Sequence, residues 1–218
     1  MIKSKKISLP ACILNIGGIS NLTLVQNLNN HEIISEDVGP GNCLINTWIQ
    51  HHTNEKFDLG GKISDRGKIN EIILEQALET HESNFQKKNN ISLDTNDFDI
   101  SFARGLNFED GAATLTSFTA KIISSKISLL LKEFNNKKIK IIICGGGRKN
   151  ESLVKQIKLN SKKNLFFFNA EDFEFNGDFV ESQAFAYLAI RAVLSLPISF
   201  PSTTGCFSPC SGGEIIDY

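Results

Sequence analysis

Short apolar runs and alternating patterns fill the first part of the chain, and both are typical of β-strands. Residues 11–16 are mostly apolar, residues 22–25 alternate, and residues 32–34 form a third short run, with glycine and asparagine between them. Such spacers mark turns. We therefore predict three consecutive antiparallel strands.

Further along, apolar residues recur every three or four positions, which is the period of an α-helix. Residues 42–51, 68–81 and 110–135 show this spacing, and the last of them is the longest such stretch in the chain. Residues 82–99 break the pattern because they are rich in Asn, Lys and Asp. We predict a surface excursion there, which could equally be a loop that faces a substrate.

The second half of the chain alternates strand and helix patterns. A β-branched run at residues 140–144 precedes a helical segment at residues 151–159, and an apolar run at residues 165–168 precedes an alanine-rich helix at residues 180–196. Residues 198–218 are rich in turn formers, so we predict irregular structure for them.

The order of these elements predicts the fold class. Antiparallel strands come first and crossover helices link the later strands, which indicates an α/β fold with a mixed five-stranded sheet flanked by helices. This order matches one domain of the actin/hexokinase-like ATPase fold, which is also described as ribonuclease H-like.

Composition and charge exclude several classes of function. The chain has 218 residues, 41% of them hydrophobic, which is enough for a core, and its formal net charge of −1 gives no basic field for nucleic acid or anionic lipid. No apolar run approaches the roughly 18 residues of a membrane-spanning helix, and the basic start lacks the apolar stretch of a signal peptide. Five scattered cysteines without a C-x-x-C pair read as free thiols. We expect a soluble, cytoplasmic protein.

Two glycines, Gly17 and Gly18, follow the first predicted strand. Glycine allows backbone N–H groups to approach an anion closely, so the pair could contact a phosphate. A plain hairpin turn explains the same pair.

An acidic pair, Glu36 and Asp37, precedes a rigid Gly-Pro-Gly turn at residues 39–41. Such a turn could fix the Asp37 carboxylate at the mouth of a cleft, where it would act as a general base or hold magnesium. Alternatively, Asp37 only caps the turn. Asn42, which follows, reads as a helix cap or a ligand contact.

Three glycines, Gly145, Gly146 and Gly147, lie between a predicted strand and a predicted helix. They would form a flat wall for a planar base or a phosphate, although a structural turn explains them as well. The spacing matches neither a dinucleotide-binding nor a Walker motif. On the last predicted helix, Glu181 stands among small and apolar residues and faces either solvent or a polar cleft.

Together and in this order, these segments resemble the anhydro-N-acetylmuramic acid kinase family. The resemblance rests on LNIGGISNLT at residues 14–23, DVGPGN at 37–42, DGAATLT at 110–116, CGGGRKN at 144–150 and ESQAFAYLA at 181–189, and on the closing segment at 196–205.

The resemblance implies an enzyme of bacterial peptidoglycan recycling. Such an enzyme uses ATP and water to convert 1,6-anhydro-N-acetylmuramic acid into N-acetylmuramic acid 6-phosphate, with Mg²⁺ accompanying the ATP and no dedicated metal site on the protein. By this resemblance the general base is Asp37. The other implied site residues are Gly17 and Gly18 at the phosphates, Gly145, Gly146, Gly147 and Asn150 at the nucleoside, and Glu181 and Asn42 at the sugar or its water.

The sequence also departs from the family pattern. The family begins with an amino-terminal domain whose glycine-rich loop grips the ATP phosphates, so residues 1–218 are expected to form the carboxyl-terminal domain alone. We expect negligible activity from this chain by itself, a possible separately encoded amino-terminal half and a possible homodimer. Val38 and Asn46 stand where the family usually has threonine and aspartate. A non-catalytic nucleotide- or sugar-binding module and another sugar or acyl kinase remain alternatives.

Overall fold

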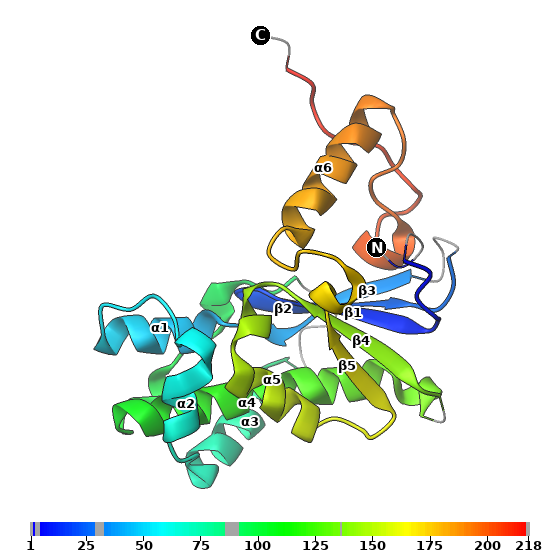
Figure 1. Cartoon of the computed structure of the whole chain (residues 1–218). Helices are drawn as coiled ribbons and strands as arrows, with labels where there is room; N and C mark the ends of the chain where they lie inside the picture. The colour runs from blue at the N-terminus through cyan, green and yellow to red at the C-terminus, as the bar shows by residue number, and fades with distance from the viewer. Residues whose placement is uncertain (1, 3–4, 29–32, 86–91, 136, 217–218) are drawn as a thin grey trace.

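A mixed five-stranded sheet organises the chain (Figure 1). The computed structural model describes residues 2, 5–28, 33–85, 92–135 and 137–216. The strands are β1 (Ala11–Ile16), β2 (Ile19–Val25), β3 (Ile33–Pro40), β4 (Ile139–Cys144) and β5 (Leu165–Asn169).

The order of the strands is β3-β2-β1-β4-β5, with β2 antiparallel to β1 and β3, and β4 parallel to β1 and β5. This is the arrangement of a ribonuclease H-like domain, so the predicted fold class is confirmed.

Strand β4, which lies between β1 and β5, shows why the sequence selects this sheet. Five of its six residues are buried, and its core is the run Ile141, Ile142 and Ile143. A strand with parallel neighbours on both sides and cover on both faces needs apolar side chains on both faces, so the run is continuous instead of alternating. In β1 the buried positions alternate more clearly, because one face is less well covered.

Seven α-helices complete the described part of the chain. They are α1 (Cys43–His52), α2 (Lys62–Arg66), α3 (Glu71–Phe85), α4 (Phe108–Leu130), α5 (Glu151–Leu159), α6 (Val180–Val193) and α7 (Pro201–Thr204).

Five predicted helices are confirmed within a few residues, and the differences are local. The helix predicted from residue 68 begins at Glu71. The residue before it, Asn70, accepts a hydrogen bond from the Ile73 N–H through its side chain and so caps the first turn. Residues 82–85 continue this helix, so the surface excursion begins later than predicted, and residues 86–91 lie outside the described part. The short helices α2 and α7 were not predicted.

The prediction that the third strand ends at residue 34 is wrong. Strand β3 continues to Pro40, because Ser35, Glu36 and Asp37 pair in register with β2. The register then shifts, and Val38 is the extra residue of a β-bulge opposite the Ser20–Asn21 step. Asp37 therefore lies within a strand, next to a bulge, instead of in a turn. Residues 29–32, where this strand was predicted to begin, are not described.

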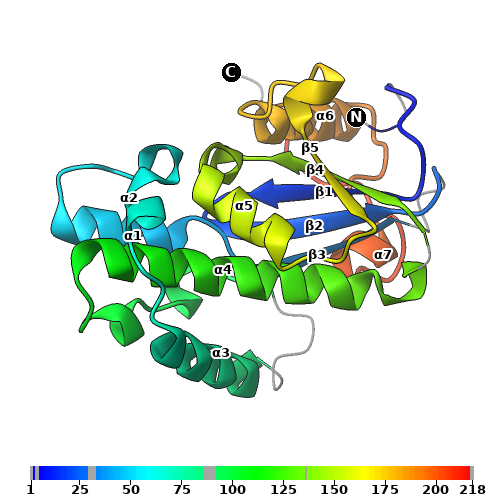
Figure 2. The same ribbon diagram turned by 60° about the horizontal axis from the view of Figure 1, so that its bottom comes forward.

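Helices cover one face of the sheet far more thickly than the other. Figure 2 shows α4 running along the sheet, with α3 beyond it and α5 beside it. The larger buried cluster lies between the sheet and α1, α3, α4 and α5. A smaller cluster on the other face joins the start of the chain to residues 170–180. From there α6 projects away from the sheet, and none of its residues is buried (Figure 1).

None of the helices in the described ranges is both long enough and apolar enough to cross a membrane. All five cysteines are free, and Cys12 and Cys144 are buried in the core.

Helix α1 docks on α4 through a tryptophan that lies against a glycine. Trp48 is 1% exposed, and its Nε1 donates a hydrogen bond to the Phe108 carbonyl oxygen at 2.9 Å. A Cβ atom on Gly111 would lie 2.1 Å from Cζ2 of this ring. The helices can approach this closely only because residue 111 has no side chain.

We predict that Gly111→Ala lowers the free energy of unfolding by about 2 kcal/mol. Overpacking against the Trp48 ring costs about 1–3 kcal/mol, which outweighs a gain of at most about 1 kcal/mol in helix propensity. Urea unfolding measures the change. Gly105→Ala is the control, because no atom lies within 4 Å of a Cβ at that position. Equal stability of the two variants would contradict this packing.

Candidate active site

The Gly-Gly turn after β1 packs directly on Gly41 and Asn42, which follow the end of β3, and the predicted Gly-Pro-Gly turn is wrong because Gly39 and Pro40 pair with β2 as strand residues. The Gly41 N–H donates to the Gly18 carbonyl oxygen and the Asn42 N–H donates to the Gly17 carbonyl oxygen, both at 2.8 Å. A Cβ atom on Gly41 would lie 2.2 Å from the Gly17 oxygen. Two motifs that are separate in the sequence are therefore one structural unit.

The triple-glycine turn joins this unit from β4. Gly145 has φ +79°, in the left-handed region that favours glycine, and a Cβ there would lie 2.4 Å from Asn15 Oδ1. A Cβ on Gly147 would lie 2.2 Å from Ile16 Cγ2 and 3.0 Å from Asn42 Nδ2. The structure thus gathers all three predicted glycine motifs at the carboxyl ends of β1 and β4.

Gly146 differs from its two neighbours. No atom lies within 4 Å of a Cβ built on it, so this part of the turn borders open space. A flat group could lie against the backbone here without meeting a side chain.

The backbone amides of Gly17 and Gly18 have different roles. The Gly17 N–H donates to the Ile19 carbonyl oxygen at 3.1 Å, so the hairpin uses it and it is not available to an anion. The predicted place of Gly17 at the phosphates stays a prediction, and any such contact would have to use another group than this N–H. Gly18 is exposed, and its N–H donates to no backbone oxygen in the described ranges. Gly18 alone of the pair keeps a donor for a phosphate.

The two predicted asparagine contacts have structural partners. Asn42 occupies the amino-terminal position of α1 but makes no side-chain cap, and its Nδ2 donates to the Gly17 carbonyl oxygen at 3.2 Å. Asn42 is therefore the N-cap residue of α1 as predicted, but its side chain makes no capping hydrogen bond. Asn150 is 6% exposed, and its Oδ1 caps α5 by accepting from the Leu153 N–H at 3.0 Å. Both side chains hold the walls of the site together.

Asp37 carries an oriented carboxylate. Its Oδ2 accepts hydrogen bonds from the Leu93 N–H at 2.8 Å and from Ser92 Oγ at 3.3 Å. No donor to Oδ1 is found among the described residues. The bulge at Val38 turns the strand at this point, as bulges next to active sites commonly do.

The loop that holds Asp37 also reaches the glycine turns. Thr95, two residues after Leu93, lies next to Gly18: a Cβ atom built on Gly18 would be 3.2 Å from Thr95 Cγ2. The loop at residues 92–97 therefore connects the carboxylate to the one glycine of the pair with a free amide.

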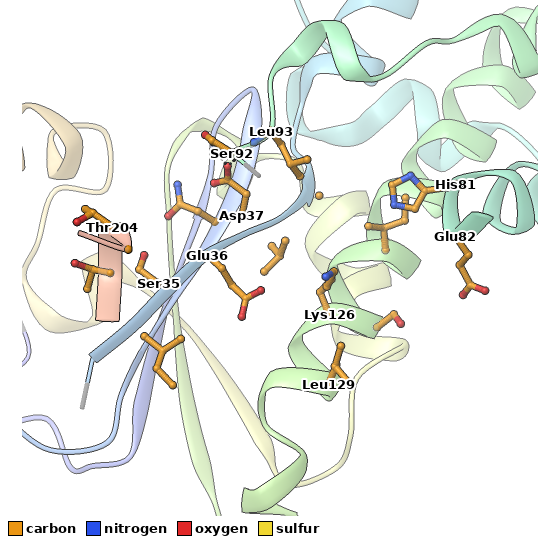
Figure 3. Close-up of a pocket in the computed structure, with 18 of the residues that line it drawn as sticks. Ser35, Glu36, Asp37, His81, Glu82, Ser92, Leu93, Lys126, Leu129 and Thr204 are labelled. Carbon is orange, nitrogen blue, oxygen red and sulfur yellow. Dashed lines mark hydrogen bonds between the residues drawn. The ribbon is translucent and has the colours of Figure 1, made fainter. Parts of the chain in front are cut away.

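Asp37 lines a cavity of about 1250 Å³ formed by β3, α3, α4 and α7. In Figure 3 Asp37 faces Ser92, His81 and Lys126 lie across the cavity, and Thr204 lies on the other side of β3. Sequence reasoning missed His81, Lys126 and Thr204, because only the packing of α3, α4 and α7 around an edge strand brings them together. The cavity is larger than the roughly 300–1,000 Å³ typical of small-molecule sites.

Glu181 lies in the exposed first turn of α6. Burial raises the pKa of the Cys144 thiol to about 11, and the Glu171 and Glu181 carboxylates add to this rise while Arg148 opposes it. Asp178, three residues before Glu181, accepts a hydrogen bond from Arg148 at the end of the triple-glycine turn, so the start of α6 lies near that turn. The predicted contact of Glu181 with the sugar or a water stays a prediction.

Comparison with known proteins agrees with this geometry. A sequence profile described as anhydro-N-acetylmuramic acid kinase matches residues 4–217. The chain belongs to the anhydro-N-acetylmuramic acid kinase family.

Individual family members show how far the similarity extends. The Pelagibacter ubique anhydro-N-acetylmuramic acid kinase is 49% identical over 216 residues, which are 99% of this chain and 57% of that protein. The Zymomonas mobilis kinase is 38% identical over 206 residues, which are 94% of this chain and 54% of that protein. The chain therefore spans about half the length of the family members it matches.

A search of solved structures finds an activator of 2-hydroxyisocaproyl-CoA dehydratase from Clostridium difficile with bound ADPNP. The TM-score is 0.43 at 18% sequence identity, over 74% of this chain and 55% of the activator.

The departure from the family at residue 38 lies in the core. Val38 is 1% exposed and belongs to the larger buried cluster, and it lines the cavity next to Asp37. A valine here therefore contributes to packing. Asn46 lies on α1, where its N–H donates to the Asn42 carbonyl oxygen.

Within the described ranges, no three His, Cys, Asp or Glu side chains come together as a metal site. The family's use of magnesium with its nucleotide stays a prediction for this chain.

His81 is a half-buried histidine in the cavity wall. Its ring stacks on Phe98 at 6.0 Å and meets the edge of Phe118 at 5.7 Å, measured between ring centroids. Burial lowers the pKa of His81 from 6.5 to about 4, and the positive charge of Lys126 contributes. The imidazole is therefore neutral at pH 7.

We predict that acid weakens the fold through His81. Between pH 6.5 and about 4 the unfolded chain binds a proton on this histidine that the folded chain does not, so the free energy of unfolding falls as the pH falls through this window. In His81→Gln the urea midpoint should fall less between pH 7 and pH 5 than in the unmodified protein. His51→Gln, at an exposed position of α1, is the matched control. An identical pH dependence of all three proteins would refute the assignment.

Proposed function

We propose that this chain supplies the general base and the nucleotide wall of an anhydro-N-acetylmuramic acid kinase. The reaction would use ATP and water to convert 1,6-anhydro-N-acetylmuramic acid into N-acetylmuramic acid 6-phosphate, in cytoplasmic peptidoglycan recycling. Family membership supports the proposal. The observation that carries it is the oriented Asp37 carboxylate, which lines a cavity and is held by a loop that also reaches Gly18.

Asp37 is suited to activate a water molecule. Hydrogen bonds from Leu93 and Ser92 hold Oδ2, which leaves Oδ1 to accept a proton. The water oxygen would bond to the anomeric carbon as the bond from that carbon to O6 breaks, and O6 would then accept the phosphoryl group. A positioned base of this kind contributes about 10²–10⁴-fold to the rate.

The glycine turns fit a nucleotide. The open space beside Gly146 suits a flat group, and the exposed amide of Gly18 suits a phosphate oxygen. ATP supplies the phosphoryl group when it is bound. Mg²⁺ would accompany its phosphates, since this ion usually keeps several waters and binds few protein ligands.

We also propose that the chain acts together with a complementary amino-terminal half. Phosphoryl transfer depends on positioning and charge stabilisation from all sides, and this chain spans about half the length of its family members. The exposed apolar residues of α6 support a protein partner at this helix, since an accumulation of large exposed apolar side chains is typical of interaction sites. They are Phe185, Tyr187, Ile190 and Val193, all at least 58% exposed. A homodimer would cover the same helix, and sedimentation of the chain alone would reveal it.

We predict that Asp37→Asn lowers kcat by about 10²–10⁴-fold while the affinity for the anhydro sugar changes little, because the amide keeps the shape but cannot accept the proton. The assay uses the chain alone and mixed with the remaining part of the Pelagibacter ubique kinase. Glu75→Gln, an exposed residue of α3, is the control. Full turnover by Asp37→Asn in the mixture would refute the assignment of the base, and full turnover by the chain alone would refute the need for a second half.

A separate prediction concerns the nucleotide wall. Gly146→Val should weaken ATP binding by about tenfold or more, since its side chain would fill the space proposed for the nucleotide, while the melting temperature changes little because no protein atom is nearby. Calorimetric titration of the same mixture measures the affinity. Gly105→Val also faces open space, away from the turn, and should change neither quantity. Unchanged ATP affinity in Gly146→Val would place the nucleotide elsewhere.

A further inference from the structure

Arg148 ends the triple-glycine turn, and its guanidinium is nearly buried. Its side chain is 7% exposed. Within its own turn, Nη1 donates to the Gly145 carbonyl oxygen at 2.9 Å. The remaining donors leave the turn and reach the segment that precedes α6. Nε and Nη2 donate to Glu171 Oε1 at 3.0 and 2.6 Å, and Nη1 donates to Asp178 Oδ1 at 2.8 Å.

The backbone strengthens the same junction. The Gly145 N–H donates to the Gly177 carbonyl oxygen at 3.3 Å, and the Gly177 N–H donates to Glu171 Oε1 at 3.0 Å. A Cβ atom on Gly177 would lie 2.4 Å from Arg148 Nε. The guanidinium therefore lies directly on a buried glycine, which leaves it little freedom to turn.

The charges at this junction persist over a wide pH range. Hydrogen bonds from Arg148 and Lys149 lower the pKa of Asp178 to about 2, and those from Arg148 lower the pKa of Glu171. Because both folded-state pKa values are lowered, the contribution of the link to stability is present above the ordinary carboxyl pKa and is lost as the pH falls through the lowered values. At neutral pH the link is fully charged.

The position of the junction gives it a role beyond stability. Asp178 is two residues before α6, and Glu181 lies in the first turn of that helix. Since α6 has no buried residue, its direction depends on how the chain is held on either side of it, by residues 170–180 before it and by α7, which packs on β3, after it. Apolar contacts of Phe173, Phe175 and Val180 hold this segment on one side, and Arg148 holds it to the glycine turn on the other.

We infer that Arg148 is a positioning residue that fixes the first turn of α6 relative to the triple-glycine turn, so that Glu181 and the glycine wall keep one geometry. The importance of that geometry for turnover rests on the proposed kinase function, whereas the mechanical link does not. Lysine can replace arginine here only in part, because one ammonium group keeps the charge but cannot reproduce a planar fork that bonds two carboxylates and a carbonyl at once.

Hydrogen exchange of the intact chain tests the link without any enzyme activity. In Arg148→Met, amides in residues 145–150 and 174–185 should exchange about tenfold faster, while those of β4 and α4 keep their protection, because only a local link is lost. Arg148→Lys should recover part of the protection. The matched control is Lys149→Met, which removes an exposed partner of the same Asp178 at 2.7 Å but leaves the glycine turn bonded. Unchanged exchange, or faster exchange throughout the chain, would overturn the inference.

Kinetics then separate positioning from a purely structural role. The assay uses the same mixture as for Asp37→Asn. There Arg148→Met should lower kcat by about tenfold with KM for ATP nearly unchanged, and Arg148→Lys should recover part of the rate. Lys149→Met should have the kcat and KM of the unmodified protein. An unaltered kcat in Arg148→Met, with exchange accelerated as expected, would refute the positioning role and leave the mechanical link. Absence of turnover in every protein, with the exchange result intact, would refute the proposed kinase function and leave the link standing.

Discussion

Close backbone approach at the carboxyl ends of β1 and β4 is the constraint on which the site depends. Gly41 lies against the Gly17 carbonyl oxygen, and Gly145 lies against the end of β1, at distances that no side chain would permit. Backbone hydrogen bonds close the first of these contacts. Because three turns from distant parts of the sequence share one small volume, a displacement of any one of them moves the other two.

Asp37 and Glu181 are attached to the domain in different ways. Asp37 lies in strand β3, and its carboxylate is held by the loop at residues 92–97, which also contacts Gly18. Glu181 belongs to a helix that stands outside the sheet, and it is connected to the triple-glycine turn through the segment anchored by Arg148. One carboxylate is therefore fixed by the body of the domain, and the other depends on a polar junction.

The sequence predicted the sheet well because its signals are local and strong. The run at residues 139–144 has to be buried on both faces, and the glycine pairs mark the turns. The length of β3 was missed because a Glu-Asp pair followed by Gly-Pro-Gly reads as a turn, while the pairing with β2 that overrides it is not local. The alanine-rich helix predicted at residues 180–196 is present as α6, and the structure leaves its large apolar residues exposed. Sequence reasoning identified the residues of the glycine motifs and Asp37. It could not show which glycine amides already donate hydrogen bonds within the protein, or that His81 and Lys126 lie across the cavity from Asp37, because both depend on tertiary packing.

The exposed state of α6 has a consequence for the energetics of assembly. A helix of 14 residues is marginal in water by itself, and most helices in proteins are stabilised by packing of an apolar face. With no buried residue, α6 lacks that contribution, so any molecule that covers its apolar side adds stability in proportion to its occupancy. Binding of such a molecule would then be linked to the folding of this end of the chain, and proteases would cut the protein here first when nothing covers α6.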